Sequence, residues 1–131
     1  MRDKQGVYYI LPGGGQLPGE TMENTVVREC MEEVGVKVKV QRLLYVREYI
    51  GKNHTFSKRH SAFHQIEHVF LCQVEDPTKA CPGFETDNHQ IGVNWLSLDA
   101  LPNIRFYPEA IKKGLGPNGA HFPEVYLGDC N

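Results

Sequence analysis

Three glutamates that could bind a metal ion lie within five residues of one another. Glu29, Glu32 and Glu33 are spaced i, i+3 and i+4, so on an α-helix their carboxylates share one face. Like charges on one face repel, and helices often relieve this with lysines one turn away, but no lysine occurs between Gly13 and Val36. The pattern therefore points to a cation that the helix itself does not supply.

A hard divalent cation, Mg²⁺ or Mn²⁺, fits this pattern. Mg²⁺ takes a few carboxylate oxygens and leaves its other positions to water and substrate phosphates. A glycine-rich loop, Gly13 to Gly19, directly precedes the glutamates and brings backbone groups near the same face. The alternative is a solvated acidic surface, because ExxEE patterns are common on helices. The glutamates alone do not separate these two interpretations.

The elements that must position the glutamates are a strand, a loop and a helix. Val7 to Leu11 is a β-branched and aromatic run that stops at Pro12, which predicts a strand feeding the glycine loop. Residues Met22 to Val34 have helical composition, and Gly35 stands where a left-handed cap would end the helix.

Further elements are predicted downstream. Residues 36–50 indicate one long or two short strands, residues 51–61 a polar loop, residues 63–74 and 91–98 two more strands, residues 106–113 a short helix, and residues from about 114 to 131 a mostly irregular tail.

The complete spacing is more specific than the glutamates. Gly14 is followed after five residues by Glu20 and after seven more by Arg28-Glu29-Cys30-Met31-Glu32-Glu33-Val34-Gly35-Val36. This resembles the Nudix box, G-x5-E-x7-R-E-U-x-E-E-x-G-U with U aliphatic, and only Cys30 departs from it. A buried cysteine behaves as a small apolar residue. The segments YYILPGG (8–14) and IGVNWLSLDAL (91–101) are also similar to Nudix sequences, so the resemblance covers most of residues 7–113.

The resemblance implies an α/β fold, an α/β/α sandwich around a mixed sheet, in which residues 14–36 form a loop-helix-loop. It implies that Glu29, Glu32 and Glu33 coordinate the metal, helped by the backbone carbonyl of Gly13. Structural positions of the motif are Gly14, Glu20, Arg28 and Gly35, with Glu20 and Arg28 expected to pair and brace the loop against the helix.

The reaction implied is attack of water on one phosphorus of a nucleoside diphosphate derivative. In the family the general base is a box glutamate, here Glu29 or Glu33, or an acid of a later loop. That loop, GFETDNHQ, contains Glu85 and Asp87, and Glu85 is preferred. Either could instead be an ordinary solvated acid.

The substrate is less well specified. Aromatic residues could stack a base and basic residues could meet phosphates, although most are ordinary strand and loop residues; they are Tyr8, Tyr9, Phe56, Phe63, Arg47, Lys52, Lys58 and Arg59. The expected partner is a small-molecule nucleotide, and a homodimer stays open. A different class of function is a Nudix-like module that binds a nucleotide without cleaving it, but such modules usually have broken box glutamates. No basic patch favours nucleic acid.

Three histidines recur every four residues, at His60, His64 and His68. On a helix they would share a face and could bind zinc. The surrounding FHQIEHVFLCQVE alternates like a strand, in which His60 and His68 lie about 26 Å apart at roughly 3.3 Å per residue. The strand interpretation is preferred because one metal could not bridge that distance.

Bulk composition indicates one globular domain over residues 1–131. The net charge is −2, there is no apolar run long enough to span a membrane and no signal peptide, so a cytoplasmic location is expected. Four scattered cysteines, Cys30, Cys72, Cys81 and Cys130, are expected to be free thiols.

The start of the chain is close to the predicted first strand. Nudix sequences usually have about 20 more residues there, which contribute sheet strands. We therefore hypothesise that N-terminal strands are lacking, which would expose a sheet edge. The alternative is that the tail, HFPEVYL at 121–127, folds back and covers that gap.

Overall fold

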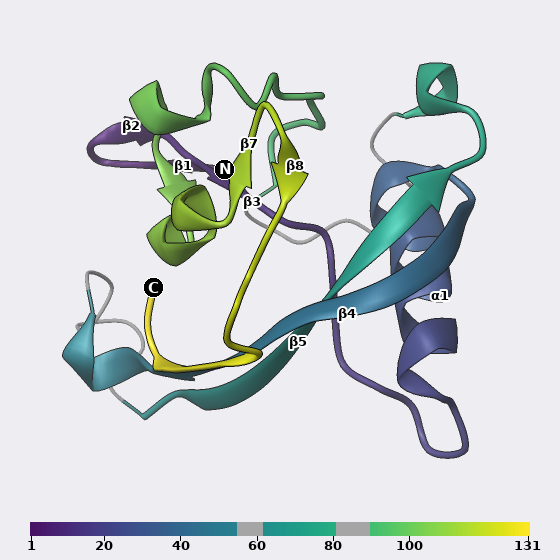
Figure 1. Cartoon of the computed structure of the whole chain (residues 1–131), viewed down its shortest axis with the longest axis horizontal. Coiled ribbons are helices and arrows are strands. Elements are labelled where there is room, and N and C mark those ends of the chain that lie inside the picture. The colour runs from purple at the N-terminus through teal and green to yellow at the C-terminus, as the bar shows by residue number, and fades with distance from the viewer. Residues whose placement is uncertain (55–61, 81–89) are drawn as a thin grey trace.

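A three-stranded mixed sheet forms the centre of the computed structural model, which describes residues 1–54, 62–80 and 90–131 (Figure 1). Its order is β5-β4-β9. Strand β4 (Val38–Ile50) pairs antiparallel with β5 (His64–Val74) and parallel with β9 (Tyr126–Asp129). The predicted α/β class and the mixed sheet are confirmed.

Helix α1 (Met22–Val34) has the predicted bounds. At its start the Thr21 side chain accepts a hydrogen bond from the Asn24 N–H at 3.1 Å. At its end Gly35 has φ 72°, and its N–H donates to the Met31 carbonyl. The helix lies beside β4 and β5 (Figure 1), so the loop-helix-loop is held against the main sheet.

Besides the main sheet, the described residues form three pairs of short strands. Strands β1 (Arg2–Asp3) and β2 (Gly6–Val7) form a hairpin, β3 (Tyr9–Ile10) pairs in parallel with β6 (Phe106–Tyr107), and β7 (Leu115–Gly116) pairs with β8 (Gly119–Ala120). The single strand predicted at 7–11 is thus divided. The reason is that neighbouring amides bond in different places, the Tyr8 N–H to the Met1 carbonyl and the Tyr9 N–H to the Arg105 carbonyl.

The prediction of a strand at residues 91–98 is wrong, because these residues form no strand. Ile91, Trp95 and Leu98 are exposed, and the Trp95 indole donates to the Pro77 carbonyl at 2.9 Å. Alternating apolar residues favour an extended chain, but a strand also needs a neighbour to complete its hydrogen-bond ladder. The described residues provide no such neighbour for this segment.

The remaining turns are 3-10 helices, η1 (Gly51–Asn53), η2 (Pro77–Lys79), η3 (Leu101–Asn103) and η4 (Glu109–Lys113). The helix predicted at 106–113 is therefore strand β6 followed by η4, separated by Pro108. No helix formed by the described residues has the length and apolar character needed to cross a bilayer. Cys30, Cys72 and Cys130 are free thiols, and Cys81 lies outside the described residues.

The tail is more regular than predicted, since residues 114–131 contain β7, β8 and β9. Strand β9 folds back onto the end of β4, where Asp129 accepts hydrogen bonds from the Ile50 N–H, the Asn53 amide and the His54 imidazole. Beside it the buried Arg47 pairs with Glu67 at 3.0 Å and donates to the Cys130 carbonyl. Side chains that a local pattern does not reveal therefore fix the tail.

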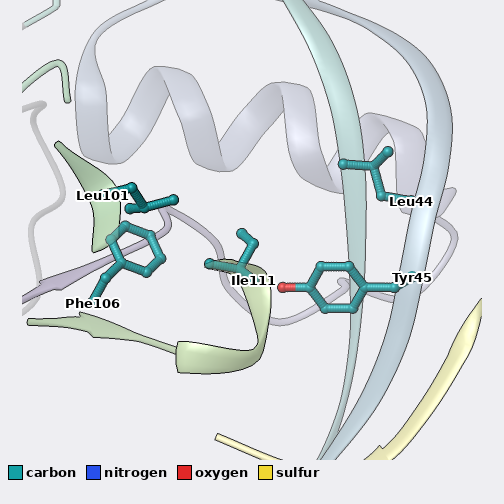
Figure 2. Packing of buried hydrophobic residues seen from close by; sticks show 5 residues of the cluster. All are labelled: Leu44, Tyr45, Leu101, Phe106 and Ile111. Carbon is teal, nitrogen blue, oxygen red and sulfur yellow. The ribbon is translucent and has the colours of Figure 1, made fainter. Parts of the chain in front are cut away.

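The core lies between β4 and the segment that contains η3, β6 and η4 (Figure 2). It consists of Leu44, Tyr45, Leu101, Phe106 and Ile111. Tyr45 is fully buried, and its ring lies 4.8 Å from that of Phe122. Its hydroxyl points toward Ile111 and has no hydrogen-bond partner, a condition shared by no other buried side-chain N or O atom among the described residues.

Replacing Tyr45 by Phe should leave the free energy of unfolding unchanged or raise it by about 1 kcal/mol, because an unsatisfied buried hydroxyl costs about 1 to 3 kcal/mol. Urea unfolding measures this. Tyr45→Ala is the control, and loss of the ring should cost about 3 to 5 kcal/mol. A Tyr45→Phe variant less stable than wild type by more than 1 kcal/mol would show that the hydroxyl is bonded.

The Asp129 contacts predict an acid-sensitive contribution to stability. Hydrogen bonds from Asn53, His54 and the Ile50 amide lower the pKa of Asp129 from 3.8 to about 2. A lowered carboxyl pKa stabilises the fold above pH 3.8, and this contribution is lost as the pH falls toward 2. The thermal midpoint of wild type should therefore drop further between pH 4 and pH 2 than that of Asp129→Asn. Parallel curves for the two proteins would contradict this.

Candidate active site

Two carboxylates of α1 converge on a single cationic nitrogen. Nη1 of Arg28 lies 2.9 Å from Oε1 of Glu29 and 2.9 Å from Oε2 of Glu32. Glu29 is buried, and the Glu32 side chain is mostly shielded from solvent. The helical spacing thus brings these two carboxylates together, and the positive charge between them comes from Arg28 of the same helix.

Arg28 also pairs with Glu20, and this is the pairing that the resemblance implied. Its Nε donates to Glu20 Oε2 at 2.8 Å, and its Nη2 donates to Glu20 Oε1 at 3.1 Å and to the Gly15 carbonyl at 2.9 Å. Hydrogen bonds from Arg28, and then from Thr25, lower the pKa of Glu20 to about 2. The pKa of Arg28 is correspondingly raised, so both groups are charged near neutral pH.

The glycine loop contacts the other end of the acidic face. The Gly13 N–H donates to Oε2 of Glu33 at 3.0 Å. At Gly14 a Cβ atom would lie 2.2 Å from Oε1 of Glu29, so only glycine lets the loop approach the helix this closely. The loop and the three glutamates therefore form one contiguous site.

Other sequence candidates lie elsewhere. Arg47 is buried in its contacts with Glu67 and Cys130, and Tyr8 is buried near Arg105, so neither is presented to a phosphate or a base. His64 and His68 lie on strand β5, as predicted, with His64 next to Glu48. The described residues contain no three His, Cys, Asp or Glu side chains already arranged to hold a metal ion.

The other residues that were considered for contact with a base or a phosphate lie in different parts of the fold. Tyr9 packs against the core, Lys52 lies in η1, and Phe63 is exposed beside β5. Several candidates lie outside the described residues, and these are Phe56, Lys58, Arg59, His60, Glu85 and Asp87.

Two residues that sequence reasoning missed contact this site. The buried Thr25 donates its hydroxyl to Glu20, and Gln90 Nε2 lies 3.4 Å from the Glu33 carbonyl. Thr25 had a weak signal, as a hydroxyl one turn after Thr21 on the helix. Gln90 had none, because it is 57 positions from Glu33.

An apolar groove of about 660 Å³ lies between the start of α1 and the sheet. It is lined by Thr21, Met22, Glu23, Leu43, Val46, His68 and Phe70. At about 1.5 Å per residue, Met22 and Glu33 are about 16 Å apart along the helix. The groove is therefore separate from the end of the acidic face.

Comparisons with known proteins agree with this loop and helix. The NUDIX domain family model matches residues 1–114. Nudix hydrolase 4 of Arabidopsis thaliana is 30% identical over 101 residues, which are 77% of this chain and 44% of that protein. The NAD-capped RNA hydrolase NudC of Chromobacterium violaceum is 31% identical over 99 residues, 76% of this chain and 31% of the relative.

A shorter match has higher identity. Diphosphoinositol polyphosphate phosphohydrolase 3-alpha of Mus musculus is 52% identical over 40 residues, 30% of this chain and 24% of that protein. The chain thus spans less than half the length of these curated relatives. Because the family model covers far more than half of the chain and includes the loop and α1, the chain belongs to the Nudix family.

Proposed function

We propose that this chain hydrolyses a diphosphate linkage in a nucleoside diphosphate derivative by metal-dependent attack of water at phosphorus. The observation that carries the proposal is the placement of three α1 carboxylates beside the glycine loop and Arg28. Glu29 and Glu32 share one nitrogen of Arg28, and Glu33 is bonded to the Gly13 N–H. Hard divalent cations prefer oxygen donors of this kind.

The donor set fits Mg²⁺ or Mn²⁺. Glu29, Glu32 and Glu33 would hold the ion with the carbonyl of Gly13, since all four residues lie at the contact between the loop and α1. A bound divalent ion would neutralise phosphate charge and acidify the attacking water. Arg28, Glu20, Gly14 and Gly35 would hold the backbone and the carboxylates in place, without contacting the substrate.

The proton of the attacking water needs an acceptor. Glu29 and Glu33 are candidates because they belong to the carboxylate set, and Glu85 or Asp87 is the candidate from the later loop. Gln90, the last residue of that loop, donates to the Glu33 carbonyl at the end of α1. We keep Glu85 as the preferred acid outside the helix.

The substrate is best identified with a panel that tests every linkage the comparisons suggest. It includes nucleoside diphosphate sugars, ADP-ribose, dinucleoside polyphosphates, NADH, nucleoside triphosphates, a diphosphoinositol polyphosphate and an NAD-capped RNA. The last two enter because relatives carry those names. One clear maximum in kcat/KM would identify the class. Mg²⁺-dependent nucleotide binding with no turnover of any compound would favour the alternative, a silent binding module.

Three broader expectations stay predictions. We infer that residues 1–131 act as one domain, supported by the pairing of β9 from the tail with β4. A cytoplasmic location is predicted from the composition, and a homodimer stays open. Size-exclusion chromatography of the purified chain with light scattering measures the oligomeric state.

Activity should require Mg²⁺ or Mn²⁺, and Glu33→Gln should lower kcat by at least about 10³ because it removes a metal-binding charge. The glutamine amide can still accept the Gly13 N–H, so the fold should be retained. Glu23→Gln is the matched control, because Glu23 is an exposed glutamate in the first turn of the same helix. Turnover that survives EDTA, or a Glu33→Gln variant near the wild-type rate, would refute the proposal.

Replacing Gly14 by Ala should lower kcat about 10²-fold, as expected when a metal-binding group is displaced by roughly 1 Å. The added Cβ would push the end of the Glu29 side chain away, and a flexible side chain can move without unfolding the protein. Gly15→Ala is the matched control, since a Cβ there meets nothing within 4 Å. Kinetics and thermal midpoints are measured together. Equal kcat for the two variants would mean that the close approach is unimportant.

A further inference from the structure

Thr25 is a buried polar residue on the inner side of α1, 8% exposed. Its hydroxyl oxygen lies 2.7 Å from Glu20 Oε1 and 3.0 Å from the Thr21 carbonyl. A threonine inside a helix usually donates to the carbonyl four residues earlier. That carbonyl also accepts the Thr25 N–H at 2.9 Å, as in any α-helix, and its second lone pair can accept the hydroxyl.

A hydroxyl has one proton to donate, so the two oxygens compete for it. The Glu20 oxygen is nearer and negatively charged, and hydrogen bonds to charged acceptors are shorter and stronger than neutral ones. Thr25 therefore donates to Glu20 rather than to the Thr21 carbonyl.

The same Glu20 oxygen holds the arginine that organises the site. Oε1 also accepts the Leu17 N–H at 3.2 Å and Nη2 of Arg28 at 3.1 Å, while Oε2 accepts Nε of Arg28. The two hydrogen bonds from Nε and Nη2 of Arg28 to Glu20 fix the plane of the guanidinium group. With the plane fixed, Nη1 reaches Glu29 and Glu32. The contacts thus run from Thr25 through Glu20 and Arg28 to two carboxylates of the site.

We propose that Thr25 is a positioning residue, whose hydroxyl sets the orientation of Glu20 and Arg28 and thereby the spacing of Glu29 and Glu32 for a divalent cation. This inference rests on the proposed function for its catalytic meaning, but not for its geometry. The Thr25 hydroxyl contacts Glu20 and the Thr21 carbonyl rather than the proposed metal-binding carboxylates, so its effect on them passes through Glu20 and Arg28.

The test compares Thr25→Val, which has nearly the same shape without the hydroxyl, with Thr25→Ser, which keeps the hydroxyl. Three measurements are made on the full chain: Mn²⁺ binding by calorimetry without substrate, hydrogen exchange of the Arg28 Nε–H by NMR, and the thermal midpoint. Thr25→Val should weaken Mn²⁺ binding about tenfold, the scale of one lost hydrogen bond to a charged group, and speed the exchange. Thr25→Ser should stay within about twofold of wild type.

A purely structural role would lower the thermal midpoint of Thr25→Val without a selective change in Mn²⁺ binding or Arg28 exchange, and this result overturns the proposal. So does a Thr25→Ser variant as impaired as Thr25→Val. If wild type binds Mn²⁺ but cleaves no compound of the panel, the proposed function fails, while a binding loss in Thr25→Val that serine rescues still supports the positioning role. A wild-type chain that binds no Mn²⁺ overturns both.

Discussion

The arrangement of the site depends on one positively charged guanidinium group that lies among negatively charged carboxylates. Arginine has five N–H donors in a fixed planar fork, and in Arg28 each has an acceptor: Nε and one Nη2 proton face Glu20, the other Nη2 proton faces the Gly15 carbonyl, and the Nη1 protons face Glu29 and Glu32. A lysine has only three donors on one nitrogen and could not span these positions. Arg28 thus offsets the repulsion between carboxylates that helical spacing creates.

The same group connects the loop to the helix, so the two cannot move independently. Gly15 accepts from Arg28, Gly13 donates to Glu33, and a Cβ at Gly14 would displace the end of the Glu29 side chain. Each of the two hydrogen bonds is modest, because a typical hydrogen bond within a protein contributes about 0.5 to 1.5 kcal/mol to stability. Their value lies in geometry: a metal site needs carboxylates held in fixed relative positions, and these contacts supply that constraint at the start of the loop.

The local parts of this arrangement could be predicted from sequence, and the non-local parts could not. Thr21 and Gly35 mark the ends of α1 because caps depend on neighbours within a few residues. Strand β4 likewise follows from its β-branched composition. In contrast, residues 91–98 have a strand pattern but no strand among the described residues to pair with. Strand β9 has a weak pattern, but it pairs with β4, and hydrogen bonds from Arg47 and Asn53 hold the tail there. Pairing is decided by residues far away in sequence, which periodicity does not report.

A second arginine, Arg47, connects the tail to the main sheet, as Arg28 connects the glycine loop to α1. Arg47, buried in β4, pairs with Glu67 and donates to the carbonyl of Cys130, and among the described residues its hydrogen bonds and ion pairs involve no member of the Arg28 network. Both networks are mounted on the same frame, since α1 and β9 each contact β4. Networks without a shared residue usually respond additively to substitution. A substitution in the Arg28 network should therefore leave the pairing of the tail with β4 unchanged.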